Sequence, residues 1–234
     1  LTQNVMTVEK LHVVPGKEDW LNYAMILDNE VRFSQEEGLL GDSTETALVK
    51  YALEKGHSKE EADAAFPLLE KLPFDSVRMR MSTLHRHGDK WVLFVKGAPI
   101  KVTEALAAPY KTQIPQWLNT NREWAAEGLR VLFFAYKVFD QKPSGIQTGI
   151  ESDLDFLGMT AMIDPPREEV IEAIKQCKTA GIKSVMITGD QPLTAQAIAE
   201  RLQLTEKGNG DVKTGAKLEK LTAEQFSNEI KNIA

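Results

Sequence analysis

With 234 residues, 42% of them hydrophobic and 26% charged, the chain has the composition of an ordinary globular protein and is long enough for two domains. A formal net charge of -6 argues against nucleic acid as a partner, because nucleic-acid-binding domains carry an excess of Lys and Arg. The sequence has no apolar run of about 18 residues that could span a membrane, and its single cysteine, Cys177, excludes an internal disulfide. The four histidines lack metal-ligand spacing, so we expect no zinc site.

The pattern of residues 5–155 predicts an α+β domain. Alternating apolar residues indicate strands and a period of 3.6 indicates helices, in an order typical of an antiparallel sheet flanked by helices. The expected elements are a strand at 5–14, helices at 19–33, 43–54 and 58–66, a hairpin of 77–85 with 91–95, helices at 100–107 and 113–126, and a strand at 131–139.

After residue 155 the pattern changes to the β-α-β-α order of a parallel, doubly wound α/β sheet. Asp164-Pro165-Pro166 marks the seam, because proline fixes its own φ and restrains the residue before it. We therefore expect one domain at 5–155 and a second at 156–234. The elements expected in the second domain are strands at 156–163 and 182–187 and helices at 168–180 and 191–202.

Thr188-Gly189-Asp190 directly follows the apolar run 182–187 and precedes the last of these helices. Open α/β sheets bind ligands outside the carboxyl ends of their strands. There a glycine lets the backbone approach an anion and the helix N-terminus offers N–H groups. The segment therefore predicts a phosphate-binding loop. The competing interpretation is an ordinary strand-to-helix turn with Asp190 near the helix cap.

Two further motifs each permit a functional and a structural interpretation. In Gly41-Asp42-Ser43-Thr44-Glu45-Thr46-Ala47-Leu48, Glu45 is either a ligand-binding carboxylate or the acidic partner of a helix capping box. In Lys96-Gly97-Ala98-Pro99, a lysine at a strand end beside a glycine can meet a phosphate with little steric obstruction. The alternative is a solvated lysine that leaves the sheet.

Together with Leu1-Thr2-Gln3-Asn4, Asp164-Pro165-Pro166-Arg167 and Met186-Ile187-Thr188-Gly189-Asp190, these motifs form five stretches in a fixed order. The set resembles the cytoplasmic part of P-type cation-transporting ATPases, in the class that contains calcium and sodium/potassium pumps. The resemblance covers nearly the whole chain. The segment Thr44 to Leu48 favours the calcium-pump subgroup, and the compact first domain favours a pump of bacterial type.

The resemblance implies a nucleotide-binding domain inserted in a phosphorylation domain of the haloacid-dehalogenase-like, Rossmann-type α/β class. Residues 1–4 would belong to the phosphorylation domain, which the chain would contain only in part. In this family the phosphate-accepting aspartate precedes Leu-Thr, so we expect the chain itself to lack turnover. The intact parent would use ATP and Mg²⁺ and work with actuator and transmembrane domains at the cytoplasmic face of a membrane. We expect the fragment to be monomeric.

The resemblance also implies roles for individual residues. Phe74 would stack on adenine, Glu45 would accept a hydrogen bond from the adenine amino group, and Lys96 and Gly97 would form the deep end of the base pocket. Arg130 would reach the phosphates, and Thr188, Gly189 and Asp190 would support the transferring phosphoryl group, with Arg167 near the seam and the ribose.

One departure affects the phosphate side of the expected site. Calcium-pump members of the family have a lysine five residues after the stacking phenylalanine, whereas this chain has Met79 there. Either Arg78 or Arg80, which flank Met79, would supply the charge, or nucleotide binding would be weaker.

Two alternatives remain open at this point. A haloacid-dehalogenase-like phosphatase with a cap domain fits the strand followed by Thr188-Gly189-Asp190, although such enzymes need a nucleophilic carboxylate at a strand end. A non-catalytic interaction domain is the other alternative, and no exposed apolar stripe in the sequence supports it.

Overall fold

The computed structural model describes residues 5–34, 36, 38–146, 148–165, 167–187, 192–205, 213, 215–222 and 224–226. The chain divides into two compact units. One comprises residues 5–122 and 130–163, and the other comprises the described parts of 123–129 and 164–234.

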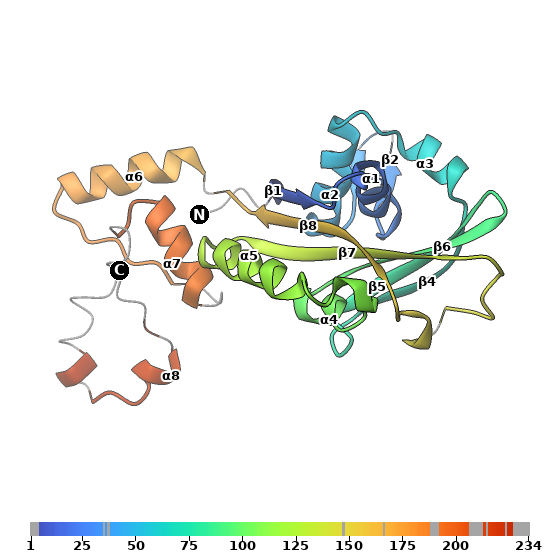
Figure 1. Cartoon of the computed structure of the whole chain (residues 1–234). Helices are drawn as coiled ribbons and strands as arrows, with labels where there is room; N and C mark the ends of the chain where they lie inside the picture. Colours follow the sequence, from blue (N-terminus) through green and yellow to red (C-terminus); the bar gives the residue numbers. More distant parts are fainter. Residues whose placement is uncertain are drawn as a thin grey trace. The chain divides into compact units, whose positions relative to one another are not determined.

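The first unit is built on a six-stranded sheet with the order β1-β8-β7-β6-β5-β4 (Figure 1). All of its pairings are antiparallel, which confirms the predicted α+β class with an antiparallel sheet. Its strands are β1 (Thr7–Val13), β4 (Leu68–Asp75), β5 (Arg80–His87), β6 (Lys90–Gly97), β7 (Arg130–Phe139) and β8 (Asp155–Ile163).

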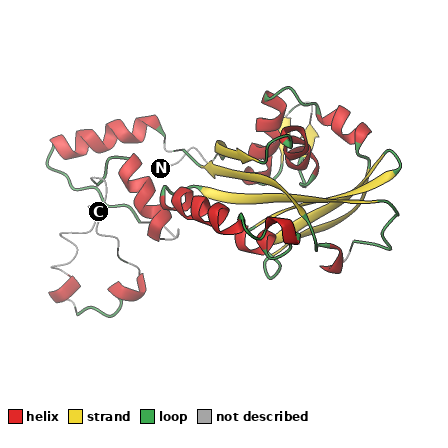
Figure 2. Cartoon of the chain, in the orientation of Figure 1, coloured by secondary structure: helices red, strands yellow, loops and turns green. Residues whose placement is uncertain are grey.

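Helices cover both faces of this sheet (Figure 2). On one face, α1 (Glu18–Leu27), α2 (Ser43–Glu54) and α3 (Lys59–Ala65) enclose a core that includes Phe94 and Phe134. On the other face lie α4 (Pro99–Thr103) and α5 (Ile114–Ala126), where Trp117 stacks on Phe156 with ring centroids 4.0 Å apart. A small antiparallel pair, β2 (Arg32–Ser34) and β3 (Gly38–Leu40), follows α1, and short 3-10 turns occupy Ala108–Tyr110 and Thr148–Ile150.

The helices that carry the candidate site begin at side-chain caps. The Asp42 carboxylate accepts a hydrogen bond from the Thr44 N–H at 2.8 Å, and the Ser58 hydroxyl accepts one from the Glu61 N–H at 3.3 Å. Each cap satisfies one of the N–H groups that the first turn of a helix leaves without a partner. The predicted starts of α2 and α3 are therefore confirmed.

The expectation that strand 156–163 opens a parallel second domain is wrong. This strand is β8, and it pairs antiparallel with both β1 and β7 inside the first unit. The compact units separate between Ile163 and Asp164, eight residues after the predicted boundary at 155. The error arose because β8 is buried on both faces, and a continuous apolar run of this kind is equally typical of a parallel strand.

An edge strand of the sheet was missed. β4 carries Pro73 and several exposed side chains, so it lacks the alternation that identifies an internal strand. Proline is tolerated there because the outer side of an edge strand needs no ladder hydrogen bonds. The sequence therefore indicated only a lead-in to the following hairpin.

The second unit contains α6 (Glu168–Thr179), α7 (Pro192–Arg201) and α8 (Gly215–Leu218). The predicted strand 182–187 does not form, and Ile182 and Ile187 are 58% and 93% exposed. A strand needs neighbouring strands to satisfy its N–H and C=O groups. In the described part of residues 164–226 no other strand is available to pair with it.

Asp28, which directly follows α1, is a fully buried acid. Among the described residues neither of its carboxyl oxygens has a hydrogen-bond partner. Burial raises the pKa of Asp28 from 3.8 to about 7, although the nearby Lys96 ammonium and Thr83 hydroxyl act in the opposite direction. The Thr83 hydroxyl lies close enough to act on this pKa but makes no hydrogen bond of good geometry to a described residue. The acid is therefore protonated between about pH 4 and 7, where a free aspartate is charged.

The raised pKa predicts how stability depends on pH. Between about pH 4 and 7 the folded state keeps a proton that the unfolded chain has lost, so the free energy of unfolding falls as the pH rises through this window. We expect Asp28→Asn to reduce this fall and to raise the free energy of unfolding by about 1–3 kcal/mol above the window. Urea unfolding at several pH values measures both effects.

The comparison must be made between variant and parent, because His85 acts in the opposite direction. Burial lowers the pKa of His85 from 6.5 to about 4, which reduces stability as the pH falls through that range. This contribution is common to both proteins and cancels in the difference. Asp140→Asn, at a side chain that is 83% exposed, is the matched control. If the free energy of unfolding had the same pH dependence in Asp28→Asn and in the parent, the raised pKa of Asp28 would be contradicted.

Candidate nucleotide site

Lys96 lies near the end of β6 with its ammonium group buried among partners from three other elements. Its Nζ donates to the Asp28 carbonyl oxygen, which follows α1, and to Glu45 Oε1 of α2 at 2.8 Å. The Met81 sulfur of β5 lies 3.3 Å from the same nitrogen. The side chains of Lys96 and Glu45 are only 8% and 14% exposed. The interpretation of Lys96 as a solvated lysine that leaves the sheet is therefore wrong.

Glu45 links this lysine to the segment that follows α1. Its Oε1 pairs with Lys96, and its Oε2 accepts the Glu30 N–H at 2.9 Å. The N-cap of α2 is supplied by Asp42, so Glu45 is directed to Lys96 and Glu30 instead of to a capping box. Each carboxylate oxygen has two lone pairs, and Glu45 therefore keeps acceptor capacity for a ligand.

Arg130 opens β7 beside the first turn of α2. Its Nη1 donates to the Thr44 hydroxyl at 2.7 Å, one residue before Glu45. Arg130 and Lys96 thus contact successive residues of the first turn of α2, Thr44 and Glu45, although the three elements are far apart in the sequence. The Arg130 side chain is exposed and retains further N–H donors for a charge-assisted contact.

A glycine is required at position 97 because the backbone of Met79 and Arg80 lies too close for a side chain. A Cβ at this position would lie 2.4 Å from the Met79 carbonyl oxygen and 2.9 Å from the Arg80 Cα. The Met79 carbonyl also accepts the Ala98 N–H at 2.9 Å, and Met79 itself has a φ of 50°. The absence of a side chain at Gly97 therefore allows the β4–β5 turn to pack against the end of β6.

Phe74 lies near the end of β4 and is 63% exposed, which is unusual for a large aromatic side chain. It occupies the irregular stretch of the β4–β5 pairing between Leu72 and Asp75, and β5 pairs Met81 with Lys96 of β6. The sheet thus places an exposed aromatic ring on the second strand from the buried lysine.

Arg78 contacts Glu151 and the Pro73 carbonyl, and not Glu45 or Lys96. Its Nη1 contacts Glu151 Oε1 at 2.5 Å, and its Nη2 donates to the Pro73 carbonyl at 2.7 Å. Glu151 also contacts Arg80 and Ser82, which alternate along β5 with Met81 and Thr83. The structure therefore places Arg78 with the face of the sheet opposite to Lys96 and does not bring it to Glu45.

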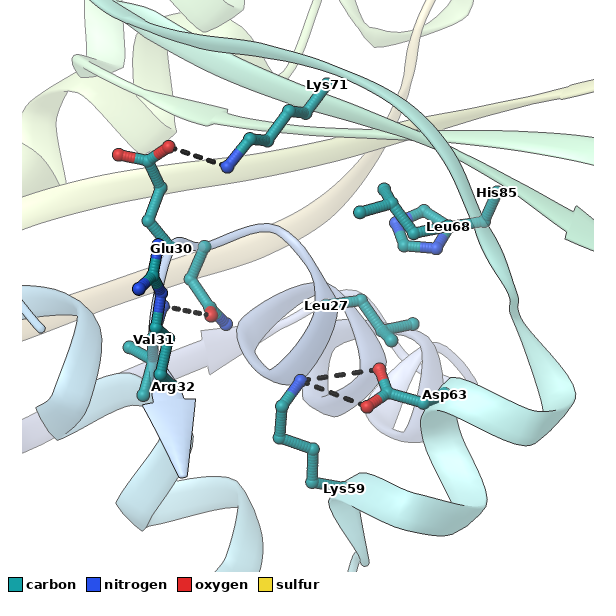
Figure 3. Close-up of a pocket in the computed structure, with 10 residues that line it drawn as sticks. Leu27, Glu30, Val31, Arg32, Lys59, Asp63, Leu68, Lys71 and His85 are labelled. Atoms are coloured by element: carbon teal, nitrogen blue, oxygen red, sulfur yellow. Dashed lines mark hydrogen bonds and ion pairs between the residues drawn. The ribbon is translucent and has the colours of Figure 1, made fainter. Parts of the chain in front are cut away.

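A cavity of about 430 Å³ lies next to this network, between the segment after α1, helix α3, the start of β4 and the end of β5. Figure 3 shows Lys71 directed toward Glu30 and Lys59 directed toward Asp63, and these ion pairs measure 2.8 and 3.3 Å. Lys71 lowers the pKa of Glu30 through its hydrogen bond and its charge. Lys71 and Phe74 belong to the same strand, so the ion pair ties β4 to the segment whose N–H binds Glu45.

The remaining predicted residues belong to the second unit. Thr188, Gly189 and Asp190 lie outside the described residues. Arg167 is exposed and occupies the N-cap position of α6. Sequence reasoning missed Asp28, Glu30, Lys71 and Glu151. These residues follow no local motif, since each joins its cluster through a contact that is distant in the sequence.

The described residues contain neither a candidate metal site nor a candidate membrane-spanning helix. No group of three or more His, Cys, Asp or Glu side chains is arranged to bind a metal ion. Among the same residues, no helix has both the length and the apolar character needed to cross a membrane.

Comparison with known proteins identifies the family. Residues 19–169 match the family model described as P-type ATPase, cytoplasmic domain N. Similar proteins include calcium-transporting ATPase 1 of Lactococcus lactis, which is 35% identical across 100% of this chain, and calcium-transporting ATPase lmo0841 of Listeria monocytogenes, which is 32% identical across 100%. The sodium/potassium-transporting ATPase subunit alpha of Hydra vulgaris is 33% identical across 72% of the chain.

The chain spans 29% of the length of the two bacterial relatives and 18% of the Hydra protein. The matched family model covers Lys96, Glu45 and Arg130 and every strand of the six-stranded sheet except β1. The chain therefore belongs to the P-type ATPases and contains their cytoplasmic domain N.

Proposed function

We propose that the first unit binds ATP and serves as the nucleotide-binding part of a cation pump. The observation that carries this proposal is the buried Lys96–Glu45 pair, at 2.8 Å, on the sheet that also presents the exposed Phe74. A largely buried, paired carboxylate with spare acceptor capacity and an exposed aromatic face provide the two contacts that an adenine base requires.

Each residue has a distinct part in the proposed binding mode. The Phe74 ring stacks on the base, a contact worth about 1–3 kcal/mol in proteins that bind single-stranded nucleic acids. Glu45 accepts a hydrogen bond from the adenine amino group, and its ion pair with Lys96 fixes the position of the carboxylate. Arg130 extends from the first turn of α2 toward the phosphates. Gly97 keeps the end of β6 narrow enough for the β4–β5 turn to pack beside it.

Arg78 contributes to this binding mode only indirectly, because Glu151 and the Pro73 carbonyl already occupy its guanidinium group. The phosphates are therefore held with fewer cationic side chains than the sequence predicted. We expect the base to supply a large share of the affinity and Mg²⁺ to arrive with the phosphates. Where the chain is described, no acidic cluster could hold a metal ion.

We further propose that the second unit is part of a haloacid-dehalogenase-like phosphorylation domain into which the first unit is inserted. The sequence Thr188-Gly189-Asp190 and the helices α6 and α7 support this assignment, with Arg167 beside the seam. In the intact protein, ATP would transfer its γ-phosphoryl group to an aspartate. The domain would lie on the cytoplasmic face of a membrane and communicate with actuator and transmembrane domains.

Calcium is the cation we propose for the parent protein, because relatives that match this chain across its full length are called calcium-transporting ATPases. We also propose that the chain is monomeric and does not bind nucleic acid, consistent with its net charge of -6. The alternative of a haloacid-dehalogenase-like phosphatase gains no support from the relatives, whose names describe transporting ATPases.

Removal of the Phe74 ring tests the stacking contact. We expect Phe74→Ala to lower the affinities for ATP, ADP and AMP by about the same factor, on the order of tenfold, because the base is common to all three. Isothermal titration of the whole chain measures the three affinities. Phe33→Ala is the matched control, since Phe33 is also exposed, at 65%. Unchanged affinities in Phe74→Ala would remove Phe74 from the site.

Replacement of the Glu45 carboxylate tests recognition of the base. Glu45→Gln replaces one acceptor oxygen with a donor amide, so the preference for ATP over ITP, which has an oxygen in place of the amino group, should fall by about tenfold. Glu54→Gln provides the control on the same helix, where the side chain is 63% exposed. An undiminished preference for ATP would place the amino group away from Glu45.

A further inference from the structure

Glu151 is a buried carboxylate that contacts three side chains of the hairpin turn and strand beyond Phe74. Its side chain has no exposed surface, and its Oε1 lies 2.5 Å from Arg78 Nη1. The Ser82 hydroxyl donates to the same oxygen, and Arg80 Nη2 lies 3.1 Å from Oε2. Two cations and one anion give this cluster a formal charge of +1.

Arg78 connects the cluster to the strand that carries Phe74. Its guanidinium group contacts Glu151 through Nη1 and the Pro73 carbonyl, one residue before Phe74, through Nη2. A planar guanidinium group makes two directed contacts of this kind at once, which an ammonium group does less well. Glu151 and Arg78 therefore fix the backbone directly before Phe74.

The turn between Phe74 and Arg80 is held by local bonds as well. Asp75 Oδ1 accepts the N–H groups of Val77 and Arg78 at 3.0 and 2.8 Å. Met79, at a φ of 50°, occupies the left-handed region that side chains other than glycine rarely adopt. A conformation of this kind persists when surrounding contacts determine it, and the contacts of Arg78 and Arg80 with Glu151 lie on both sides of Met79.

Arg80 anchors the other side of the turn. Besides its ion pair with Glu151, its Nη1 donates to the Lys101 carbonyl of α4 at 3.1 Å. Met81, the next residue, turns to the opposite face and contacts Lys96. The cluster thus sets the position of β5 between Phe74 on one side and Lys96 on the other.

We propose that Glu151 is a positioning residue for nucleotide binding, which holds the β4–β5 turn so that Phe74 keeps its place relative to Lys96. This inference rests on the proposed function. Glu151 acts through Arg78 and Arg80 and does not touch the nucleotide. Its side chain is fully buried with the two arginines, whose side chains are 12% and 13% exposed.

A role of Glu151 in positioning Phe74 can be distinguished from a role of Arg78 in binding phosphate. If Glu151 positions Phe74, removal of its carboxylate should lower the affinity for every adenine compound by the same factor. If Glu151 instead keeps Arg78 away from the phosphates, removal of the Glu151 carboxylate frees Arg78 to contact them. The affinity for ATP should then rise relative to the affinity for adenosine. Comparison of adenosine, AMP and ATP therefore separates the two roles.

The experiment measures the affinities of the whole chain for adenosine, AMP and ATP in the parent, Glu151→Gln and Arg78→Lys. We expect each variant to lower the affinities for all three ligands by about three- to tenfold, because part of the stacking contact is lost. Arg78→Lys keeps the charge and leaves Glu151 paired with Arg80. It therefore tests the same connection if Glu151→Gln does not fold, since loss of one partner from a buried ion pair can be strongly destabilising.

NMR of the Phe74 ring provides a readout that altered stability alone would not change. In both variants the ring resonances should shift and broaden, while those of Phe94 and Phe134 in the core remain as in the parent. Glu54→Gln is the matched exposed control and should leave the ring and all three affinities unchanged. The proposal would be overturned by an unchanged adenosine affinity with an unaltered Phe74 ring, or by a variant whose ratio of ATP affinity to adenosine affinity is higher than that of the parent.

Phe74→Ala distinguishes the possible failures. If the parent binds no adenosine, or Phe74→Ala binds as the parent does, the proposed function fails and the role of Glu151 fails with it. If Phe74→Ala weakens binding but Glu151→Gln and Arg78→Lys do not, the nucleotide site stands and only the positioning role of Glu151 is wrong.

Discussion

The buried ammonium group of Lys96 is the constraint on which the site depends. A charge in the interior of a protein is costly unless other groups pair with it and bond to it. Glu45 supplies the opposite charge and the Asp28 backbone supplies a carbonyl, which brings α2 and the end of α1 to the same point of the sheet. Glu30 then bonds to Glu45, and its ion pair with Lys71 reaches the edge strand that carries Phe74. One buried charge thus connects most of the elements that a base would contact.

The strand β5 separates two charged clusters on opposite faces of the sheet. Successive side chains of a strand point to opposite faces, so Met81 lies with Lys96 while Arg80 and Ser82 lie with Glu151. The two clusters therefore share a backbone although their side chains do not meet. This geometry explains how a residue with no access to a ligand can still affect the position of Phe74. It also explains why Arg78, a natural candidate for phosphate binding in the sequence, has other partners in the structure.

The errors of the sequence analysis concern pairing between distant segments. The apolar strand β8 was assigned to a parallel sheet, since an apolar run carries no information on the direction of its neighbours. The run 182–187 was expected to be a strand because its residues favour one, but strand propensity has no effect without a partner. The edge strand β4 was overlooked because an edge tolerates proline and exposed side chains. In contrast, the helices of the first unit followed local signals and were located within a few residues, except that the one predicted at 19–33 ends earlier, at Leu27, and is followed by β2.

Local patterns and motifs in a fixed order were sufficient to establish the class of the first unit, the helices that begin near residues 43 and 58, the hairpin of β5 and β6, and the family. The sequence also selected Glu45, Lys96 and Arg130 as candidate site residues, but could not exclude a capping box or a solvated lysine. The folded structure was needed to choose between these interpretations, since the partners of each side chain are supplied by segments far along the chain. The same reason applies to the buried acid Asp28 and to Glu151. Burial and pairing with distant residues give these carboxylates their importance, and neither property has a local sequence signal.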